Sequence, residues 1–379
     1  MTHTAHAEFS PEKIGALSYQ APFFLFSKQR ILDTYNEFVQ NFPGAAIHYA
    51  VKANSEPEIL ELLRDAGSSF ETASQHELEY LKTANVDPER IVYGTSVKSS
   101  AHIRAFHEYG VNRFAADSFP ELEKIAAIAP GARVYVRAIA NDTGSVFRFS
   151  EKFGTAKENV VPLLRHAKEI GLIPYGISFH VGSQASNPLA WAHAIRELKD
   201  TLVELKKYDI EIETLNLGGG FPCRYVTNEE ATTIAEIAEY TMKEYHQLPY
   251  QPKIILEPGR AMVAESGILV TTVIARVGRG ENTWLFLDAG VYNALFEAMA
   301  YQGSTRYPVT SLRNSYDSGE MLYALAGPTG DSPDIITREA LLPRDLDVGD
   351  ELIIHKVGAY TLTTASTFNG FPRPPVYYI

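Results

Sequence analysis

The chain has 379 residues, of which 45% are hydrophobic and 21% are charged, as in folded globular proteins. Its 46 acidic and 34 basic residues give a formal net charge of −12, which disfavours binding to nucleic acids and to anionic membranes. No apolar run approaches the roughly 20 residues that a membrane-spanning helix needs, and the first residues lack a secretory pattern. The single cysteine, Cys223, excludes internal disulfides and multi-cysteine metal sites. We therefore predict a cytoplasmic, enzyme-sized protein without a metal.

From residue 28 to about residue 257 the sequence alternates between helical periodicity and short apolar runs. Apolar residues at three- and four-residue spacing predict helices, for example around 59–63 and 198–205. The first 20 residues are polar, and we expect them to be loose. Short apolar runs predict buried strands at 22–26, 47–51, 91–93, 134–136, 176–180, 214–217 and 253–257. Six to eight such units over roughly 230 residues fit a (β/α)8 barrel, with an open doubly wound sheet as the alternative.

After about residue 264 the pattern changes. The runs 268–277, 283–288 and 351–355 are rich in β-forming residues and are separated by Gly, Pro and Asp turns. We predict a barrel over residues 28–262. Residues 1–27 and 263–379 are predicted to form a separate β-domain that carries the segment GPTGDSPD (327–334).

Two polar residues follow predicted barrel strands, at the ends where barrel enzymes place their chemistry. Lys52 ends an apolar run, and a desolvated lysine there can condense with a carbonyl group. His180 is placed where an imidazole can stack on a planar ring. The alternatives are an exposed lysine at a strand end and a histidine that is part of the core.

Two further strand ends carry groups suited to an anion and a base. Gly218, Gly219 and Gly220 let backbone N–H groups approach an anion, although a plain tight turn explains them too. Glu257 and Arg260 either pair with each other or hold two ends of one ligand. A lysine, a ring stacker, an anion nest and a carboxylate are together what a phosphorylated aromatic aldehyde requires.

These motifs, in this order, resemble the barrel-fold pyridoxal-phosphate-dependent decarboxylases of basic amino acids, which are related in fold to alanine racemase. The resemblance covers nearly the whole chain, and the motifs FHVGSQ and STFNGF are more similar to the ornithine/lysine branch than to the diaminopimelate branch. The segments that carry it are AVKAN (50–54), FETASQHEL (70–78), SFHVGSQ (178–184), LGGGFP (217–222), LEPGR (256–260), GPTGDSPD (327–334), GAY (358–360) and STFNGF (366–371).

The resemblance implies an α/β fold with a (β/α)8 barrel and a C-terminal β-domain, pyridoxal phosphate as the cofactor, and a head-to-tail homodimer with shared active sites. Lys52 would hold the cofactor covalently, and Glu257 would pair with its ring nitrogen. Glu71 stands where the family commonly has aspartate, and Glu77 matches a further acidic position. The implied cofactor-binding residues are Lys52, Glu71, Arg137, His180, Ser183, Gly218, Gly219, Gly220, Glu257, Arg260 and Tyr360.

The sequence departs from the family at one position of the loop 327–334. Gly330 replaces a cysteine that is the family's candidate proton donor after CO2 leaves. Asp331 is kept, and it can pair with a distal ammonium group of a basic amino acid. Gln302 stands where some relatives have an acidic residue. The implied catalytic residues are Lys52, His180, Glu257, Gly330 and Asp331, and the implied substrate-binding residues are Asp331, Gln302, Tyr292, Tyr360 and Phe368.

Several functions remain open at this point. The main hypothesis is decarboxylation of ornithine, lysine or a related basic L-amino acid to the amine. Because general acid catalysis is worth roughly 10²–10⁴-fold, loss of the cysteine favours as an alternative a reaction that ends in an aldehyde, by oxidative deamination or transamination. A non-catalytic regulatory homologue is a third hypothesis. A racemase is disfavoured, because the loop offers no second base opposite Lys52.

Overall fold

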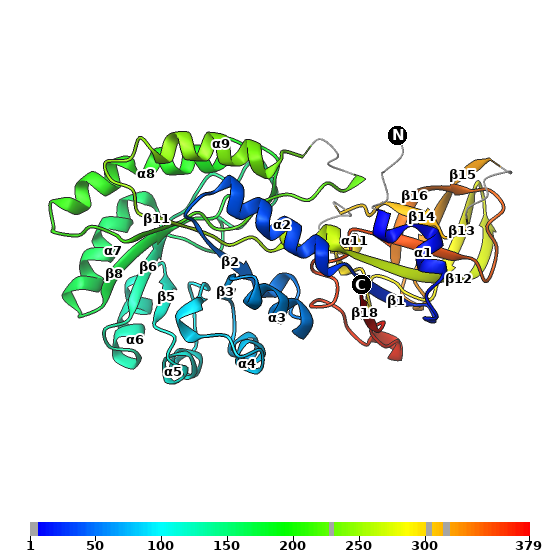
Figure 1. The fold of residues 1–379 in the computed structure, drawn as a ribbon, viewed down its shortest axis with the longest axis horizontal. Coiled ribbons are helices and arrows are strands. Elements are labelled where there is room, and N and C mark those ends of the chain that lie inside the picture. The colour runs from blue at the N-terminus through cyan, green and yellow to red at the C-terminus, as the bar shows by residue number, and fades with distance from the viewer. Residues whose placement is uncertain (1–6, 227–230, 301–304, 314–318) are drawn as a thin grey trace. The chain divides into compact units, whose positions relative to one another are not determined.

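The computed structural model describes residues 7–226, 231–300, 305–313 and 319–379. The chain divides into two compact units (Figure 1). The barrel unit comprises Leu32–Pro222 and Glu230–Met262, and the β-unit comprises Met1–Ile31, Cys223–Glu229 and Val263–Ile379. Within the described ranges, none of the helices combines the length and the apolar character needed to cross a membrane.

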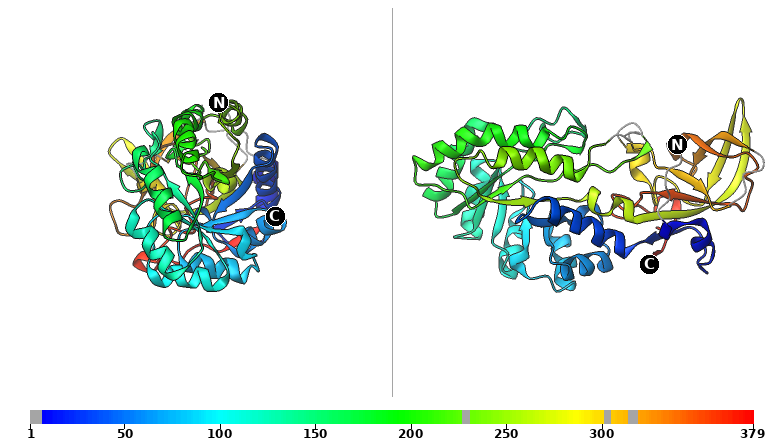
Figure 2. Two further views of the ribbon diagram at one scale, coloured as in Figure 1. Left: turned by 90° about the vertical axis from the view of Figure 1, so that its left-hand side faces the viewer. Right: turned by 45° about the horizontal axis from the view of Figure 1, so that its top comes forward.

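Eight parallel strands close the barrel, and helices surround them (Figure 2). Around the barrel the order is β2, β3, β4, β5, β6, β8, β10, β11, and β11 pairs with β2 to close it. The strands are β2 (Ala46–Ala50), β3 (Ser69–Thr72), β4 (Ile91–Tyr93), β5 (Arg113–Ala116), β6 (Arg133–Arg137), β8 (Ile173–Ser178), β10 (Thr214–Asn216) and β11 (Lys253–Leu256). The closed barrel confirms the predicted fold class, and the open sheet was the wrong alternative.

Helices alternate with these strands along the chain. The helices are α2 (Lys28–Asn41), α3 (Pro57–Asp65), α4 (Gln75–Thr83), α5 (Ser100–Tyr109), α6 (Phe119–Ile128), α7 (Lys157–Glu169), α8 (Ala190–Lys206), α9 (Ile234–Tyr245) and the short α10 (Arg260–Val263). Helix α3 shows why the periodicity was informative, because three of its four aliphatic residues, Ile59, Leu60 and Leu63, are buried. Helix α9 begins with a reciprocal capping box between Thr233 and Glu236.

A small second sheet lies in the barrel unit and was not predicted. Strand β7 (Ser145–Phe147) pairs antiparallel with β9 (Ser183–Ala185), with Phe147 opposite Ser183. Three residues are too few to show a two-residue alternation in sequence. This sheet places the segment 142–150 next to the residues that follow β8.

The β-unit is built on one eight-stranded sheet, whose main path runs β14-β17-β12-β13-β15-β16. Strand β1 pairs with β12 and β18. The strands are β1 (Phe23–Phe26), β12 (Gly267–Arg279), β13 (Asn282–Leu287), β14 (Val309–Ser311), β15 (Glu320–Ala326), β16 (Ile335–Pro343), β17 (Glu351–His355) and β18 (Val376–Tyr378), with the short helix α11 (Phe296–Met299). All three runs that predicted strands here are strands.

The expectation of a loose N-terminal segment is wrong for its described part. A 3-10 turn at Ala7–Phe9 and helix α1 (Pro11–Gly15) are formed, and Phe9 and Ile14 are buried in a cluster with strands β1 and β12. The two apolar side chains are isolated among polar residues, so their spacing gave no periodic signal.

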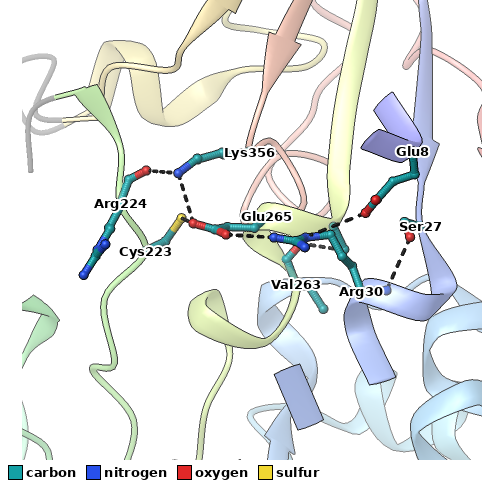
Figure 3. Close-up of polar contacts among 9 residues, drawn as sticks. Glu8, Ser27, Arg30, Cys223, Arg224, Val263, Glu265 and Lys356 are labelled. Carbon is teal, nitrogen blue, oxygen red and sulfur yellow. Dashed lines mark hydrogen bonds and ion pairs between the residues drawn. The ribbon is translucent and has the colours of Figure 1, made fainter. Parts of the chain in front are cut away.

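Glu265 is the centre of an ionic cluster in the β-unit (Figure 3). Its carboxylate lies 3.0 Å from Nζ of Lys356 and 3.4 Å from Nη2 of Arg30. Arg30 is also 3.9 Å from Oε1 of Glu8. The buried Cys223 places its Sγ 3.9 Å from Oε1 of Glu265. Cys223 is therefore a buried residue beside the ionic cluster of the β-unit.

Candidate active site

Lys52 and Glu71 form an ion pair at the carboxyl ends of β2 and β3. Lys52 lies in the 3-10 turn Val51–Ala53 that follows β2, and its Nζ donates to Oε2 of Glu71. The Lys52 side chain is 44% exposed, whereas that of Glu71 is 5% exposed. The Lys52 nitrogen is thus accessible to a ligand, whereas the Glu71 carboxylate beside it is buried.

Glu77 adds a second acid near this pair. Its Oε2 accepts the backbone N–H of Ala73 at 2.6 Å. Burial, followed by the charge of Glu71, raises the pKa of Glu77 to about 7. Near neutral pH, the protonation of Glu77 therefore depends on the charge of Glu71.

His180 is a partly buried, neutral imidazole just after β8. Its Nδ1 accepts the backbone N–H of Gly182 at 3.0 Å, so the ring proton belongs on Nε2. Burial, and then the positive charges of Arg137 and Lys52, hold the pKa of His180 well below its usual value. A neutral ring fixed in this way is suited to stacking on a planar ligand.

The glycine triplet is packed too closely for any side chain. A Cβ on Gly218 would overlap the carbonyl oxygen of Phe179, and one on Gly220 would overlap that of Gly182. A Cβ on Gly219 would lie 2.5 Å from the carbonyl oxygen of Glu257 and 3.3 Å from Nε2 of His180. The triplet thus brings the backbone beside the imidazole and the end of β11, as a close-approach anion site requires.

Glu257 is a partly buried acid whose pKa is raised to about 7, by desolvation first and by the charge of Glu71 second. Asn216, the last residue of β10, donates its Nδ2 to Oε1 of Glu257 at 2.6 Å. The same amide accepts the N–H of Gly218 through Oδ1 at 2.9 Å. Asn216 was not singled out from the sequence, although a polar residue inside a buried strand beside three glycines was a usable signal.

Arg137 and Arg260 bring positive charge to the same unit. Arg137 ends β6, and burial lowers its pKa, while Glu257 and Glu71 oppose that shift. The guanidinium of Arg137 lies 5.3 Å from the ring centre of Phe153. Arg260 is 4% exposed, and its guanidinium lies 5.3 Å from the ring centre of Phe147.

The segment 142–150 contacts two of the candidate residues, Arg260 through Phe147 and His180 through Phe149, and it was missed from the sequence. Asp142 accepts the N–H groups of Phe149 and Ser150 at 2.8 and 2.9 Å. Phe149 then presents its ring edge to His180, with centroids 5.2 Å apart and planes at 85°. The sequence gives little indication of this contact, because residues 147–149 (FRF) resemble an ordinary β-strand.

In the β-unit, three of the predicted substrate-binding residues come together. The hydroxyl of Tyr292 donates to Oδ2 of Asp331, and the Tyr292 and Phe368 rings lie 4.6 Å apart. Tyr360 belongs to the same unit and has a left-handed backbone, with φ of 53°. Gly330 donates its N–H to Oδ1 of Asn369 at 3.4 Å. Gln302 lies outside the described residues.

The match to a family model decides what kind of site this is. Residues 28–264 match the model described as pyridoxal-dependent decarboxylase, pyridoxal binding domain. The chain belongs to the pyridoxal-dependent decarboxylase family. This membership confirms the resemblance stated above, the predicted cofactor pyridoxal phosphate and the predicted enzyme class, an amino-acid decarboxylase.

Individual relatives agree over nearly the full length. The chain is 33% identical to the lysine/ornithine decarboxylase of Selenomonas ruminantium, covering 93% of this chain and 88% of that protein. It is 27% identical to the agmatine-bound arginine decarboxylase of Paramecium bursaria Chlorella virus, with a TM-score of 0.89 and 97% and 98% of the chains covered. It is 30% identical to antizyme inhibitor 2 of Xenopus laevis over 94% of this chain and 80% of that protein, so the relatives include one named as an inhibitor.

The residues of the barrel unit fit pyridoxal phosphate. Lys52 offers a primary amine for the aldehyde, and the side-chain-free glycine triplet offers a cradle beside the neutral His180. Glu257 is partly buried and has a raised pKa, so a cationic ring nitrogen would stabilise its ionised form. Each part of the cofactor therefore has a chemically matched partner on this chain.

Proposed function

We propose that this decarboxylase converts a basic L-amino acid, namely ornithine, lysine or a close relative, to the corresponding amine and CO2. The observation that carries the proposal is the accessible Lys52 amine paired with the buried Glu71 in the barrel unit that also holds His180 and Glu257. The two decarboxylases among the relatives reported above are named for lysine, ornithine or arginine, which supports a basic substrate.

In this proposal each polar group of the barrel unit has one task toward the cofactor. Lys52 binds the aldehyde carbon, His180 stacks on the ring, and Arg137 neutralises the phenolic oxygen. Since the N–H of Gly218 is already donated to Asn216, the phosphate would be left with the N–H groups of Gly219 and Gly220. The remaining proposed phosphate ligands in the barrel unit are Ser183 and Arg260, and the role of Tyr360 stays a prediction from the family resemblance.

The chemistry depends on where charge is held. Bound pyridoxal phosphate supplies an electron sink for the pair released when the Cα–carboxylate bond breaks. Glu257, oriented by Asn216, holds a proton at the ring nitrogen. Glu71 holds the proton at the nitrogen of Lys52. Each carboxylate thereby stabilises positive charge on the nitrogen that it contacts.

Substrate choice is assigned to the β-unit. We propose that Asp331 pairs with the distal cation of the substrate. Tyr292 orients the Asp331 carboxylate, and Phe368 packs against Tyr292. We also propose a head-to-tail homodimer in which the loop 327–334 completes the neighbouring site. Gln302 is a further proposed substrate contact.

Gly330 favours a second candidate reaction. A Cβ added at Gly330 would meet no atom within 4 Å among the described residues, so this position has room for the thiol that is absent here. Without that donor, O2 can act as the oxidant: amino acid, O2 and water give aldehyde, CO2, ammonia and hydrogen peroxide. The non-catalytic alternative predicts no CO2 at all.

The test is CO2 release by the cofactor-loaded protein from L-ornithine, L-lysine, L-arginine and diaminopimelate. We expect the highest kcat/KM with ornithine or lysine, and loss of both CO2 release and visible cofactor absorbance in Lys52→Ala. No CO2 from any of the four substrates would contradict the proposed function. A visible band that persists in Lys52→Ala would contradict the role of Lys52.

A further inference from the structure

Glu71 is one methylene longer than the aspartate that is common at its position in the family. Its side chain is 5% exposed and reaches Nζ of Lys52 from strand β3. A longer buried side chain needs extra volume, because protein interiors are close-packed. The neighbouring strand β4 shows where that volume comes from.

Gly94 follows β4 directly and lies alongside the end of β3. Strands β3 and β4 pair with Thr72 opposite Tyr93, and the N–H of Gly94 donates to the carbonyl of Thr72 at 3.0 Å. A Cβ on Gly94 would lie 2.7 Å from Cγ and 2.9 Å from Cδ of Glu71, and would overlap Oε1. The Glu71 carboxyl group therefore occupies the space of a side chain at position 94.

Backbone conformation does not require this glycine. Gly182 and Gly220 have φ of 87° and 99°, which disfavour any L side chain. Gly94 is not among the positive-φ glycines of the chain. Space for a neighbouring side chain is then the reason for glycine at position 94, and alanine is allowed by the backbone.

We propose that Gly94 is a positioning residue for the decarboxylation, because it leaves the space in which Glu71 reaches Lys52. This inference rests on the roles proposed for Lys52 and Glu71. Positions 71 and 94 therefore share one space, and we expect aspartate, which lacks the Cδ and Oε1 atoms of Glu71, to tolerate alanine at position 94 better than glutamate does. Gly94→Ala moves the carboxylate away from Lys52 without removing a charge from the site.

The experiment compares wild type, Gly94→Ala, Glu71→Asp and the double variant as cofactor-loaded enzymes. We expect Gly94→Ala to lower kcat/KM by about 10–100-fold, mainly through kcat, because a reacting group is misplaced by about 1 Å. The double variant should recover at least about tenfold over Gly94→Ala. In Gly94→Ala the pH midpoint of the visible cofactor band should shift down, because the anion that favours a proton on the Lys52 nitrogen is displaced.

A second readout uses the cofactor-free proteins and needs no activity. The loss of Tm in the double variant should be smaller than the sum of the losses in the two single variants, because the two sites share one space. Gly278→Ala is the control, since a Cβ there would meet no atom within 4 Å and φ is ordinary. If Gly94→Ala does not fold, the double variant should still fold.

Three results would overturn the inference: wild-type kcat/KM and band midpoint in Gly94→Ala, strictly additive effects at positions 71 and 94, or a double variant that also fails to fold. These outcomes are separable from failure of the proposed function. If the wild-type protein has no decarboxylase activity, the Tm values of the cofactor-free variants still test whether positions 71 and 94 are coupled. An active enzyme with additive effects would reject only the role of Gly94.

Discussion

Asn216 donates its Nδ2 to Oε1 of Glu257 at 2.6 Å, and this contact orients the acid that we assign to the cofactor's ring nitrogen. The same asparagine holds the N–H of Gly218, so one side chain connects the end of β10 to both the acid and the glycine triplet. The proposed ring-nitrogen site and phosphate site are therefore built as one unit.

The first prediction concerns Glu257. Glu257→Gln should retain pyridoxal phosphate and lower kcat on the order of 100-fold, because a neutral amide no longer holds a proton at the ring nitrogen. Steady-state kinetics with ornithine or lysine measure the loss, and the visible spectrum checks cofactor content. Glu213→Gln is the control, since that carboxylate is 57% exposed and pairs with Arg133. Unchanged turnover in Glu257→Gln would refute the role.

The second prediction concerns pH and the cofactor-free protein. The pKa of Glu257 is about 7 when folded, against an ordinary 4.5, so between these values the native state keeps a proton that the unfolded chain has lost. The stabilising effect is therefore fully present below pH 4.5 and is lost as pH rises through 7. Its size is about 3 kcal/mol or less.

The measurement is the Tm of cofactor-free wild type and Glu257→Gln from pH 5 to pH 8. Glutamine does not titrate, so the Tm of the wild type minus that of the variant should decrease as pH rises. Glu77 is present in both proteins and cancels in the difference. A difference that stays flat or increases with pH would show that Glu257 is not a raised-pKa acid in the folded state.

The third prediction concerns the loop position 330. A thiol fits at Gly330, because its Cβ would meet no described atom within 4 Å and φ is not left-handed. If the wild type makes aldehyde, Gly330→Cys should raise the ratio of amine to aldehyde by about tenfold or more, since a general acid is restored. Gly330→Ala supplies the methylene without the thiol and should leave the ratio unchanged. Equal ratios in all three proteins would mean that the thiol does not decide the product.

The fourth prediction concerns the ring contact between Phe149 and His180. Phe149→Leu should weaken pyridoxal phosphate binding by roughly 2- to 13-fold, since such ring pairs are worth about 0.5–1.5 kcal/mol. Absorbance titration of the cofactor-free protein measures the Kd. Phe119→Leu is the matched control, because Phe119 makes a similar edge contact with His166, with centroids 5.3 Å apart. Equal affinities in the two variants would argue against a role for Phe149.

The sequence was informative where a residue's task depends on its own strand. Lys52, His180 and Glu257 follow apolar runs, and the carboxyl ends of barrel strands are where such groups meet. Strands β3 and β5 were not singled out, since SFET and RFAA are short and only partly apolar. Closure of the barrel depends on pairing between Leu256 and Ile47, a contact across some 200 residues that periodicity does not encode.

Other parts of the site depend on contacts between segments that are distant in sequence. Gly94 reads as a turn glycine until the Glu71 side chain is seen in its Cβ position. Asp142 reads as a loop acid until its bonds to the backbone of 149–150 are seen. Both are packing relationships, so their sequence signal lies in pairs of residues rather than in a motif.

The most direct test of the central claim is product identification by mass spectrometry, with the cofactor-loaded protein and L-ornithine or L-lysine in air. We predict an amine lighter than the substrate by one CO2, formed in equal amount to the CO2 released, and no product with Lys52→Ala. An aldehyde with ammonia and hydrogen peroxide in place of the amine would contradict simple decarboxylation. That result would establish the second candidate reaction, in which Gly330 marks a changed outcome.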